Sequence, residues 1–334
     1  MSRQERATPL RPPPQENTLS CPPPESPHLD PGATGLTGTG LLAPPRRAPS
    51  TPVPAGVEEQ VVFDVGARVA SGRYVPGARL TLAELRRSTG HAPRQLRPAL
   101  DHLAGQGVIT SDWLIPDTRP EGHTVTRTRD LLAAMINHGA YPAGRPLPTR
   151  GVLATALLAG PSDLDRALRL LAGENVISLS GNARSHVLPR PGSPGRGAWP
   201  PGHDQVRDAL PKERRQGAGH DRPTLLRVRE AARDRWKSGV CPDPDTMTDQ
   251  EQRQAETLHR LISRAYTHTT GCDPRSYAPV RSAAGRSMAC GALPTHGPLH
   301  ERMFRFTVLA ASLHDLIEAL AGAGFPVQPG RSLR

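Results

Sequence analysis

The chain has 334 residues, a formal net charge of +11 and a sequence pI of about 10.6. Only 36% of the residues are hydrophobic and 3% aromatic, beside 38 prolines and 32 glycines, which excludes one packed core over the whole length. The charge favours a polyanionic partner, above all nucleic acid, although a GC-rich coding sequence would also enrich arginine. Four irregularly spaced cysteines argue against a disulfide framework, and no apolar run reaches the ~18 residues of a membrane helix, so we expect a cytoplasmic protein.

Composition divides the chain into five parts. Residues 1–56 are rich in Pro, Gly, Ser and Thr and are expected to be a disordered tail. Residues 57–128 and 129–190 are two similar segments, here called the first and second repeat. A basic, flexible linker is expected over 191–223, and a helical C-terminal region over 224–334.

The repeat consists of two blocks of matching residues. In the first block, the matches recur at a constant shift of 67: Gly72, Tyr74, Gly77 and Leu80 recur as Gly139, Tyr141, Gly144 and Leu147. In the second block, the shift is 68: Leu96, Ala99, Leu100, Leu103, Gly105, Val108 and Ile109 recur as Leu164, Ala167, Leu168, Leu171, Gly173, Val176 and Ile177. Self-similarity at a nearly fixed spacing predicts two small domains of the same fold in tandem.

Within the first repeat, Leu82 and Leu85 predict a short helix that ends near Thr89-Gly90. The first four residues of the second block, Leu96, Ala99, Leu100 and Leu103, then fall at i, i+3, i+4 and i+7, which is one face of a further helix. Its other face carries Arg94, Gln95 and Arg97 near the start. Arginine and glutamine can contact guanine and adenine edges, so this helix-turn-helix suits reading of the DNA major groove.

The second repeat has the same plan. Thr149 is expected to cap its short helix, and the outer face of the next helix shows Ser162, Arg166 and Arg169 together with Asp163 and Asp165. The segment VISLSGNARSHVLP then predicts two strands around a tight turn at Gly181-Asn182. The candidate DNA-contacting residues are Arg94, Gln95, Arg97, Thr149, Arg150, Ser162, Arg166, Arg169, Arg184 and His186.

Both repeats resemble the winged-helix domain of GntR-type transcription regulators. The first repeat carries the resemblance with Val69, Gly72, Tyr74, Gly77, Leu80, Ala99, Leu100, Leu103, Gly107 and Val108. The second carries it with Ile136, Gly139, Tyr141, Gly144, Leu147, Ala167, Leu168, Leu171, Asn175 and Val176. The resemblance implies a mainly α fold with small β wings: tandem winged helix-turn-helix domains followed by a helical C-terminal region.

The sequence departs from that family at the start of the recognition helix. Pro93 and Pro161 stand where the family usually has an arginine, and a second helical arginine is kept as Arg97 but replaced by Asp165. An aspartate there would face DNA phosphates unfavourably. Pro98 lies inside the first recognition helix, which is therefore expected to begin later or to be kinked.

The C-terminal region shows helical apolar patterns without a catalytic motif. A helix that contains Val308, Leu313 and Leu316 is expected either to form a homodimer or to pack as a core helix. The metal-capable residues His268, Cys272, Cys290, His296 and His300 lack the tight spacing of a zinc site, so no metal and no cofactor are expected. Nothing in residues 224–334 identifies a small-molecule effector.

These observations give one main hypothesis and two alternatives. The main hypothesis is a sequence-specific transcriptional regulator that binds double-stranded DNA and is not an enzyme. The alternatives are a replication- or partition-associated winged-helix protein, and a protein-docking module that does not read DNA sequence.

Overall fold

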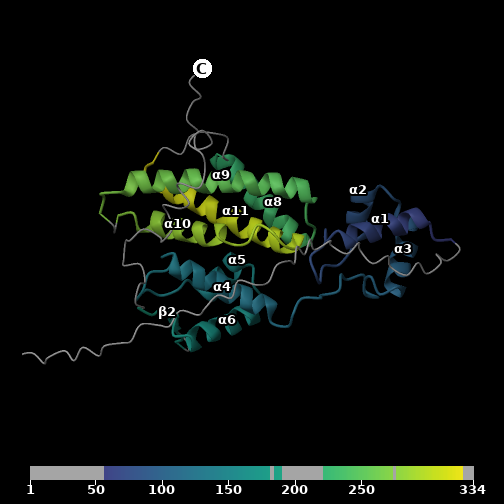
Figure 1. Ribbon diagram of the computed structural model, residues 1–334, viewed down its shortest axis with the longest axis horizontal. Coiled ribbons are helices and arrows are strands. Elements are labelled where there is room, and N and C mark those ends of the chain that lie inside the picture. The colour runs from purple at the N-terminus through teal and green to yellow at the C-terminus, as the bar shows by residue number, and fades with distance from the viewer. Residues whose placement is uncertain (1–55, 181–183, 190–220, 274–275, 326–334) are drawn as a thin grey trace, which may run out of the picture. The chain divides into compact units, whose positions relative to one another are not determined.

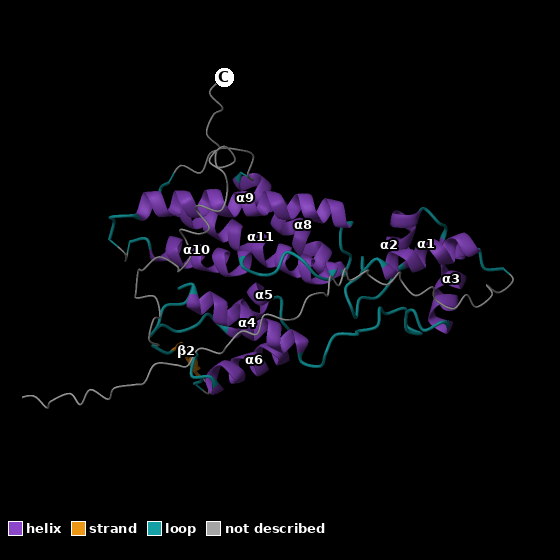
Figure 2. Cartoon of the chain, viewed as in Figure 1, coloured by secondary structure: helices purple, strands orange, loops and turns teal. Residues whose placement is uncertain are grey.

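The computed structural model describes residues 56–180, 184–189, 221–273 and 276–325. Over these residues the chain is mainly helical, with small β elements, as expected (Figures 1 and 2). The helices are α1 (Glu59–Ala70), α2 (Leu82–Thr89), α3 (Pro93–Gly105), α4 (His123–Asn137), α5 (Arg150–Leu157), α6 (Pro161–Gly173), α8 (Arg222–Ser238), α9 (Pro244–Thr269), α10 (Ala278–Gly291) and α11 (Leu299–Gly322); the strands are β1 (Ile177–Ser178) and β2 (His186–Val187). Nearly all of the expected tail, most of the expected linker and the turn at Gly181-Asn182 lie outside the described residues.

Helices α1, α2 and α3 form a first bundle around the leucine face expected for α3. Its core contains Val61, Val65, Tyr74, Leu80, Leu85, Leu96, Ala99, Leu100, Leu103, Ile109 and Ile115. The side chain of Thr81 caps α2, and Gly90 ends it with a left-handed φ of 81°, so the chain turns sharply into α3. The expectation that α3 begins later is wrong: the helix begins at Pro93 and continues past Pro98, where the proline removes one backbone hydrogen bond.

Helices α4, α5 and α6 form a second bundle with the same order of elements. Leu158 ends α5 in the left-handed conformation, at φ 50°. Pro161 begins α6 three residues later. The domain boundary expected between residues 128 and 129 falls inside α4. That helix begins at His123, after Gly122 with a φ of 77°, and nothing in the sequence that follows interrupts it.

The paired residues of the two repeats share backbone conformations. The pairs have matching positive φ angles: Gly72 and Gly139 (72° and 74°), Gly77 and Gly144 (82° and 73°), and Gly107 and Asn175 (73° and 55°). Asparagine is one of the few non-glycine residues that tolerates this region. The substitution at position 175 therefore preserves the turn that follows the helix.

The same backbone hydrogen bonds tie each bundle to its extended segments. In the first bundle, Gly77 N donates to Ile115 O and Leu80 N donates to Trp113 O, both at 2.9 Å. In the second bundle, the matching donors are Gly144 to Val187 O at 2.8 Å and Leu147 to Ser185 O at 2.7 Å. The second hairpin pairs antiparallel, with Ile177 opposite Val187 and Ser178 opposite His186. In both bundles, the segment before the second helix pairs with the segment that follows the third.

The C-terminal helices pack around α11, which contacts α8, α9 and α10 (Figure 1). Every residue from Met303 to Ala310 is buried, so this part of α11 is covered on all sides by its own chain. Of the two roles expected for this helix, homodimer formation and packing in the core, the structure shows packing in the core. Helix α10 lies within the region expected to be helical, but the sequence did not predict it as a separate helix, because its small residues show no apolar periodicity. The second bundle shares one continuous hydrophobic core with α10 and α11. Among the described helices, none is both long and apolar enough to cross a membrane.

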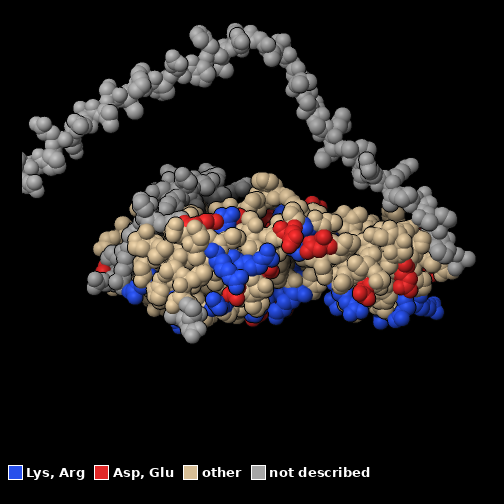
Figure 3. All heavy atoms as spheres, turned by 90° about the horizontal axis from the view of Figure 1, so that it is seen from below, with Lys and Arg blue, Asp and Glu red and all other residues tan. Residues whose placement is uncertain are grey.

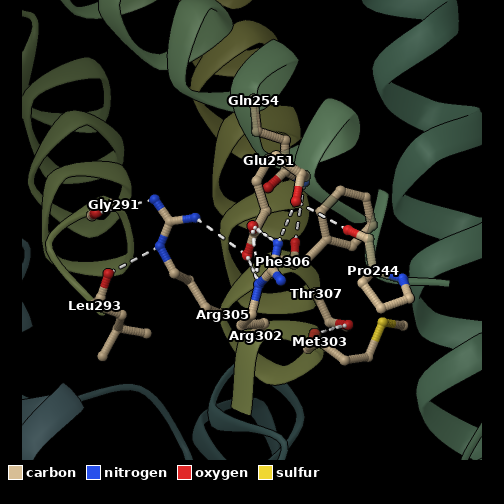
Figure 4. A network of polar contacts seen from close by, with 11 residues as sticks. Pro244, Glu251, Gln254, Gly291, Leu293, Arg302, Met303, Arg305, Phe306 and Thr307 are labelled. Atoms are coloured by element: carbon tan, nitrogen blue, oxygen red, sulfur yellow. Dashed lines mark hydrogen bonds and ion pairs between the residues drawn. The ribbon is translucent and has the colours of Figure 1, made fainter. Parts of the chain in front are cut away.

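A buried polar network fastens α9 to α11 (Figure 4). Arg302 Nη2 donates to Glu251 Oε2 at 2.6 Å, and Gln254 Nε2 donates to Phe306 O at 3.0 Å. Arg305 Nε donates to Leu293 O at 2.9 Å, which joins α11 to the end of α10. Because Glu251 is only 6% exposed, its carboxylate depends on these partners for solvation.

Candidate nucleic-acid interface

The first candidate surface is the outer face of α3. Arg94 and Arg97 are both exposed there, opposite the buried leucines, as the periodicity predicts. Gln95 is already engaged: its Oε1 accepts from Ala92 N at 2.8 Å, and its Nε2 donates to both carboxylate oxygens of Glu58 at 2.9 Å. Contact of the Gln95 side chain with any further group would require these bonds to break, whereas the side chains of Arg94 and Arg97 are exposed.

The hairpin after α3 is attached to that helix by Trp113. Arg97 lies 5.9 Å from the centre of the indole ring, and Trp113 Nε1 donates to Asp101 Oδ1 at 3.1 Å. A guanidinium held against an aromatic face loses less conformational freedom when it binds a ligand. Trp113 has a left-handed φ of 58°. Sequence reasoning missed Trp113, whose only signal is an isolated tryptophan just after the helix.

The phenol of Tyr74 forms a hydrogen bond with α2 in the first bundle. Its hydroxyl donates to Glu84 Oε2 at 2.9 Å. Burial, together with the nearby Glu84 carboxylate, raises the pKa of Tyr74 well above its usual value. The phenol therefore remains a hydrogen-bond donor to Glu84 at physiological pH and links the first block of the repeat to α2.

The second candidate surface is the outer face of α6. Ser162, Arg166 and Arg169 are all exposed on it. Arg150, at the start of α5, places Nε 3.2 Å from Asp165 Oδ1. This contact partly neutralises the aspartate that stands where the first repeat has Arg97. Thr149 is exposed at the N-cap position of α5 but makes no side-chain capping bond, contrary to expectation.

The hairpin of the second bundle carries the remaining candidates. Arg184 and His186 are exposed on β2 and its approach, while the neighbouring Val187 is buried in the core. Val187 lies ten positions after Ile177, whereas the matching Ile115 lies six positions after Ile109, so this hairpin is four residues longer than the first. A longer hairpin with basic residues suits a wing that reaches a phosphate.

The basic side chains do not form a single patch on the face drawn in Figure 3. Lys and Arg gather there in separate groups, with acidic side chains nearby. The α6 surface has the same mixed character, since Asp163 and Asp165 lie beside Arg166 and Arg169. Contact with a polyanion would therefore involve a few individual arginines and not a continuous basic surface.

The metal-capable residues of the C-terminal region are not gathered into a site. Cys290 is buried in α10, the ring of His268 stacks on Phe325, and His300 Nε2 lies 3.4 Å from Glu301 Oε1. Over the described part of the chain, no group of three or more His, Cys, Asp or Glu is placed to hold a metal ion.

Comparison with known proteins adds little to this geometry. No family model matches the chain, and no curated protein does. Among solved structures, the chain is similar to the GntR of Streptococcus agalactiae, with 17% identity over 60% of this chain and 99% of that one, at a TM-score of 0.19. With a TM-score this low, the likeness supports no inference about fold or function.

Proposed function

We propose that this chain is a cytoplasmic, bacterial-type transcriptional regulator that binds double-stranded DNA through two tandem winged helices and is not an enzyme. The observation that carries the proposal is the shared hydrogen-bond pattern of the two bundles. In each, the segment before the second helix pairs with the hairpin after the third. A helix-turn-helix backed in this way by a hairpin is the arrangement of a winged helix, and its third helix is the one that enters the major groove.

The first bundle is the stronger candidate reader. Arg94 and Arg97 project from the first two turns of α3, the part of a recognition helix that meets base edges. Arginine pairs with guanine through two parallel hydrogen bonds. In the second bundle, Arg166, Arg169 and Arg184 would add contacts, and linkage of the two bundles would raise affinity through effective concentration.

A second candidate function, protein docking, is favoured by one feature of the second bundle. Leu170 is 48% exposed on the same face of α6 as Arg166, and Leu179 is 43% exposed just after β1. Exposed leucines beside paired charges suit a protein surface better than a phosphate backbone. In this alternative, the first bundle binds DNA and the second binds a protein.

Selection of genomic fragments by the purified protein at near-physiological salt, followed by sequencing, tests the proposal. An enriched motif with two half-sites would support reading by both bundles, and a single short motif would support reading by the first alone. Uniform recovery with a steep salt dependence would indicate non-specific phosphate binding. Failure to recover DNA would remove the proposal, and with it any DNA binding by the first bundle, and would leave protein docking by both bundles.

A further inference from the structure

A cavity of about 370 Å³ lies where α4 and α5 meet α8, α10 and α11. This volume is at the lower end of the range for small-molecule sites. The elements around it share one hydrophobic core, so the cavity belongs to the folded body of the protein. Its apolar wall is made by Met135, Val152, Ala156, Leu158, Val308 and Ala311.

The polar lining has an excess of positive charge. Arg229 and Arg233 reach the cavity from α8, and Arg286 reaches it from α10. Among the described residues that line the cavity, the only carboxylate is that of Asp315, whose Oδ2 lies 3.6 Å from Arg286 Nη2. Arg229 Nη1 lies 3.1 Å from His314 Nδ1, a partner that brings no negative charge. Three guanidinium groups against one carboxylate suit an anionic ligand.

The apolar lining is also incompletely covered. Val152 is 58% exposed, although it lies on the cavity wall and on a helix whose next leucine, Leu153, is fully buried. An exposed aliphatic side chain at the edge of a cavity is stabilised when an apolar group covers it. The positive charge and the apolar wall therefore suit one molecule with an anionic group at one end and an apolar body at the other.

We propose that this cavity binds a small organic acid, with its carboxylate between Arg229, Arg233 and Arg286 and its apolar body against Val152, Ala156 and Val308. The arginines lie on α8 and α10 while the valine and alanine lie on α5, so the ligand bridges the second bundle and the C-terminal helices. Bound ligand would stabilise this contact in proportion to its concentration over its dissociation constant.

Calorimetric titration of the full-length protein, without DNA, tests the proposal. The probes are octanoate and benzoate, and the neutral control is octanamide. We expect at least one of the two acids to bind saturably and octanamide to bind about tenfold more weakly than octanoate, because a neutral amide loses the charge-assisted bonds to arginine. Equal affinity for octanoate and octanamide, or no binding of either acid at millimolar concentration, would overturn the proposal.

Two variants place the binding in this cavity. Arg233→Gln removes an exposed guanidinium from the lining and should weaken acid binding about fivefold, whereas Arg227→Gln, on the same helix but outside the lining, should leave it unchanged. Ala311→Phe should abolish binding by filling the cavity. If that variant does not fold, the two arginine variants decide the matter. Equal affinities for Arg233→Gln and Arg227→Gln would show that the acid binds elsewhere.

Discussion

Asp165 Oδ1 in α6 lies 3.2 Å from Arg150 Nε in α5. The aspartate stands at the position where the first repeat has Arg97, so the two bundles present opposite charges at one point of the same fold. The pair also joins the two helices that flank the turn. A DNA phosphate approaching α6 would have to compete with Asp165 for Arg150.

Removing this carboxylate should therefore favour DNA binding by the second bundle. We expect Asp165→Asn to raise affinity for a selected DNA fragment about threefold, since one repulsive charge near a phosphate costs on the order of 1 kcal/mol in water. The free energy of unfolding should change by less than about 1 kcal/mol, because the pair is partly exposed. Fluorescence anisotropy and urea unfolding measure the two effects. Asp249→Asn, exposed on α9, is the control, and an unchanged affinity would argue that α6 does not face DNA.

Arg97 provides the sharper test of base reading. We expect Arg97→Ala to lose about 1–3 kcal/mol of discrimination at one base position of the selected motif. The preference at the other positions should persist. Repeating the fragment selection with the variant measures this. Arg253→Ala, exposed on α9, should leave the motif intact. A uniform loss of affinity across all sequences would instead make Arg97 a phosphate contact.

Local patterns predicted α2, α3, α5 and α6 and the turn after Thr89, whereas α1 and α4 were not among the predicted helices. The i, i+3, i+4, i+7 leucines gave the buried face of α3, and Asn175 could stand for a glycine because both accept a positive φ. Helix α10 escaped prediction because close packing on every side had removed its amphipathic signal. The engagement of Gln95 by Glu58 was also out of reach, since it joins side chains 37 positions apart. The acid-binding cavity depends on five helices, and no single segment of the sequence contains it.

The buried carboxylate of Glu251 should be important for stability. It is 6% exposed and accepts hydrogen bonds from Arg302, so Glu251→Ala would leave Arg302 without its charged partner. We expect a loss of about 3 kcal/mol in the free energy of unfolding, the usual cost of breaking one side of a buried ion pair. Urea unfolding measures the loss, with the exposed Glu230→Ala as control. Equal unfolding midpoints for the two variants would contradict the role of the network.

Glu301 should make stability depend on pH. Burial alone would raise its pKa, but the hydrogen bond to His300 and the charges of Arg127 and His123 outweigh burial and hold the pKa at about 2. Because the folded pKa is below the ordinary value, the contribution is present above about pH 4.5 and is lost as the pH falls toward 2. We expect Glu301→Gln to be less stable than the wild type near neutral pH by about 2 kcal/mol, and the difference to vanish near pH 2. Unfolding across this range measures it, and a constant difference would show that ionisation of Glu301 is not the cause.

Gly285 sets how closely α10 approaches the second bundle. A Cβ atom at this position would lie 2.4 Å from His138 O and 2.8 Å from Ala140 N, both backbone atoms that cannot rotate away. The adjoining Ser282 Oγ donates to Ala140 O at 2.6 Å, so any shift of α10 would also strain this bond. We therefore expect Gly285→Ala to lower the free energy of unfolding by about 1–3 kcal/mol, although alanine favours helix.

Gly105→Ala is the matched control for this last effect. Gly105 is also helical, but a Cβ there meets nothing within 4 Å, so its replacement should be neutral or stabilise the chain by up to about 1 kcal/mol. The urea concentration at the unfolding midpoint should thus fall for Gly285→Ala and should rise or stay unchanged for Gly105→Ala. If both variants were as stable as the wild type, the backbone of α10 at Gly285 would not lie in close contact with the loop after α4. Loss of stability in the Gly285 variant alone would locate the sensitivity at that contact.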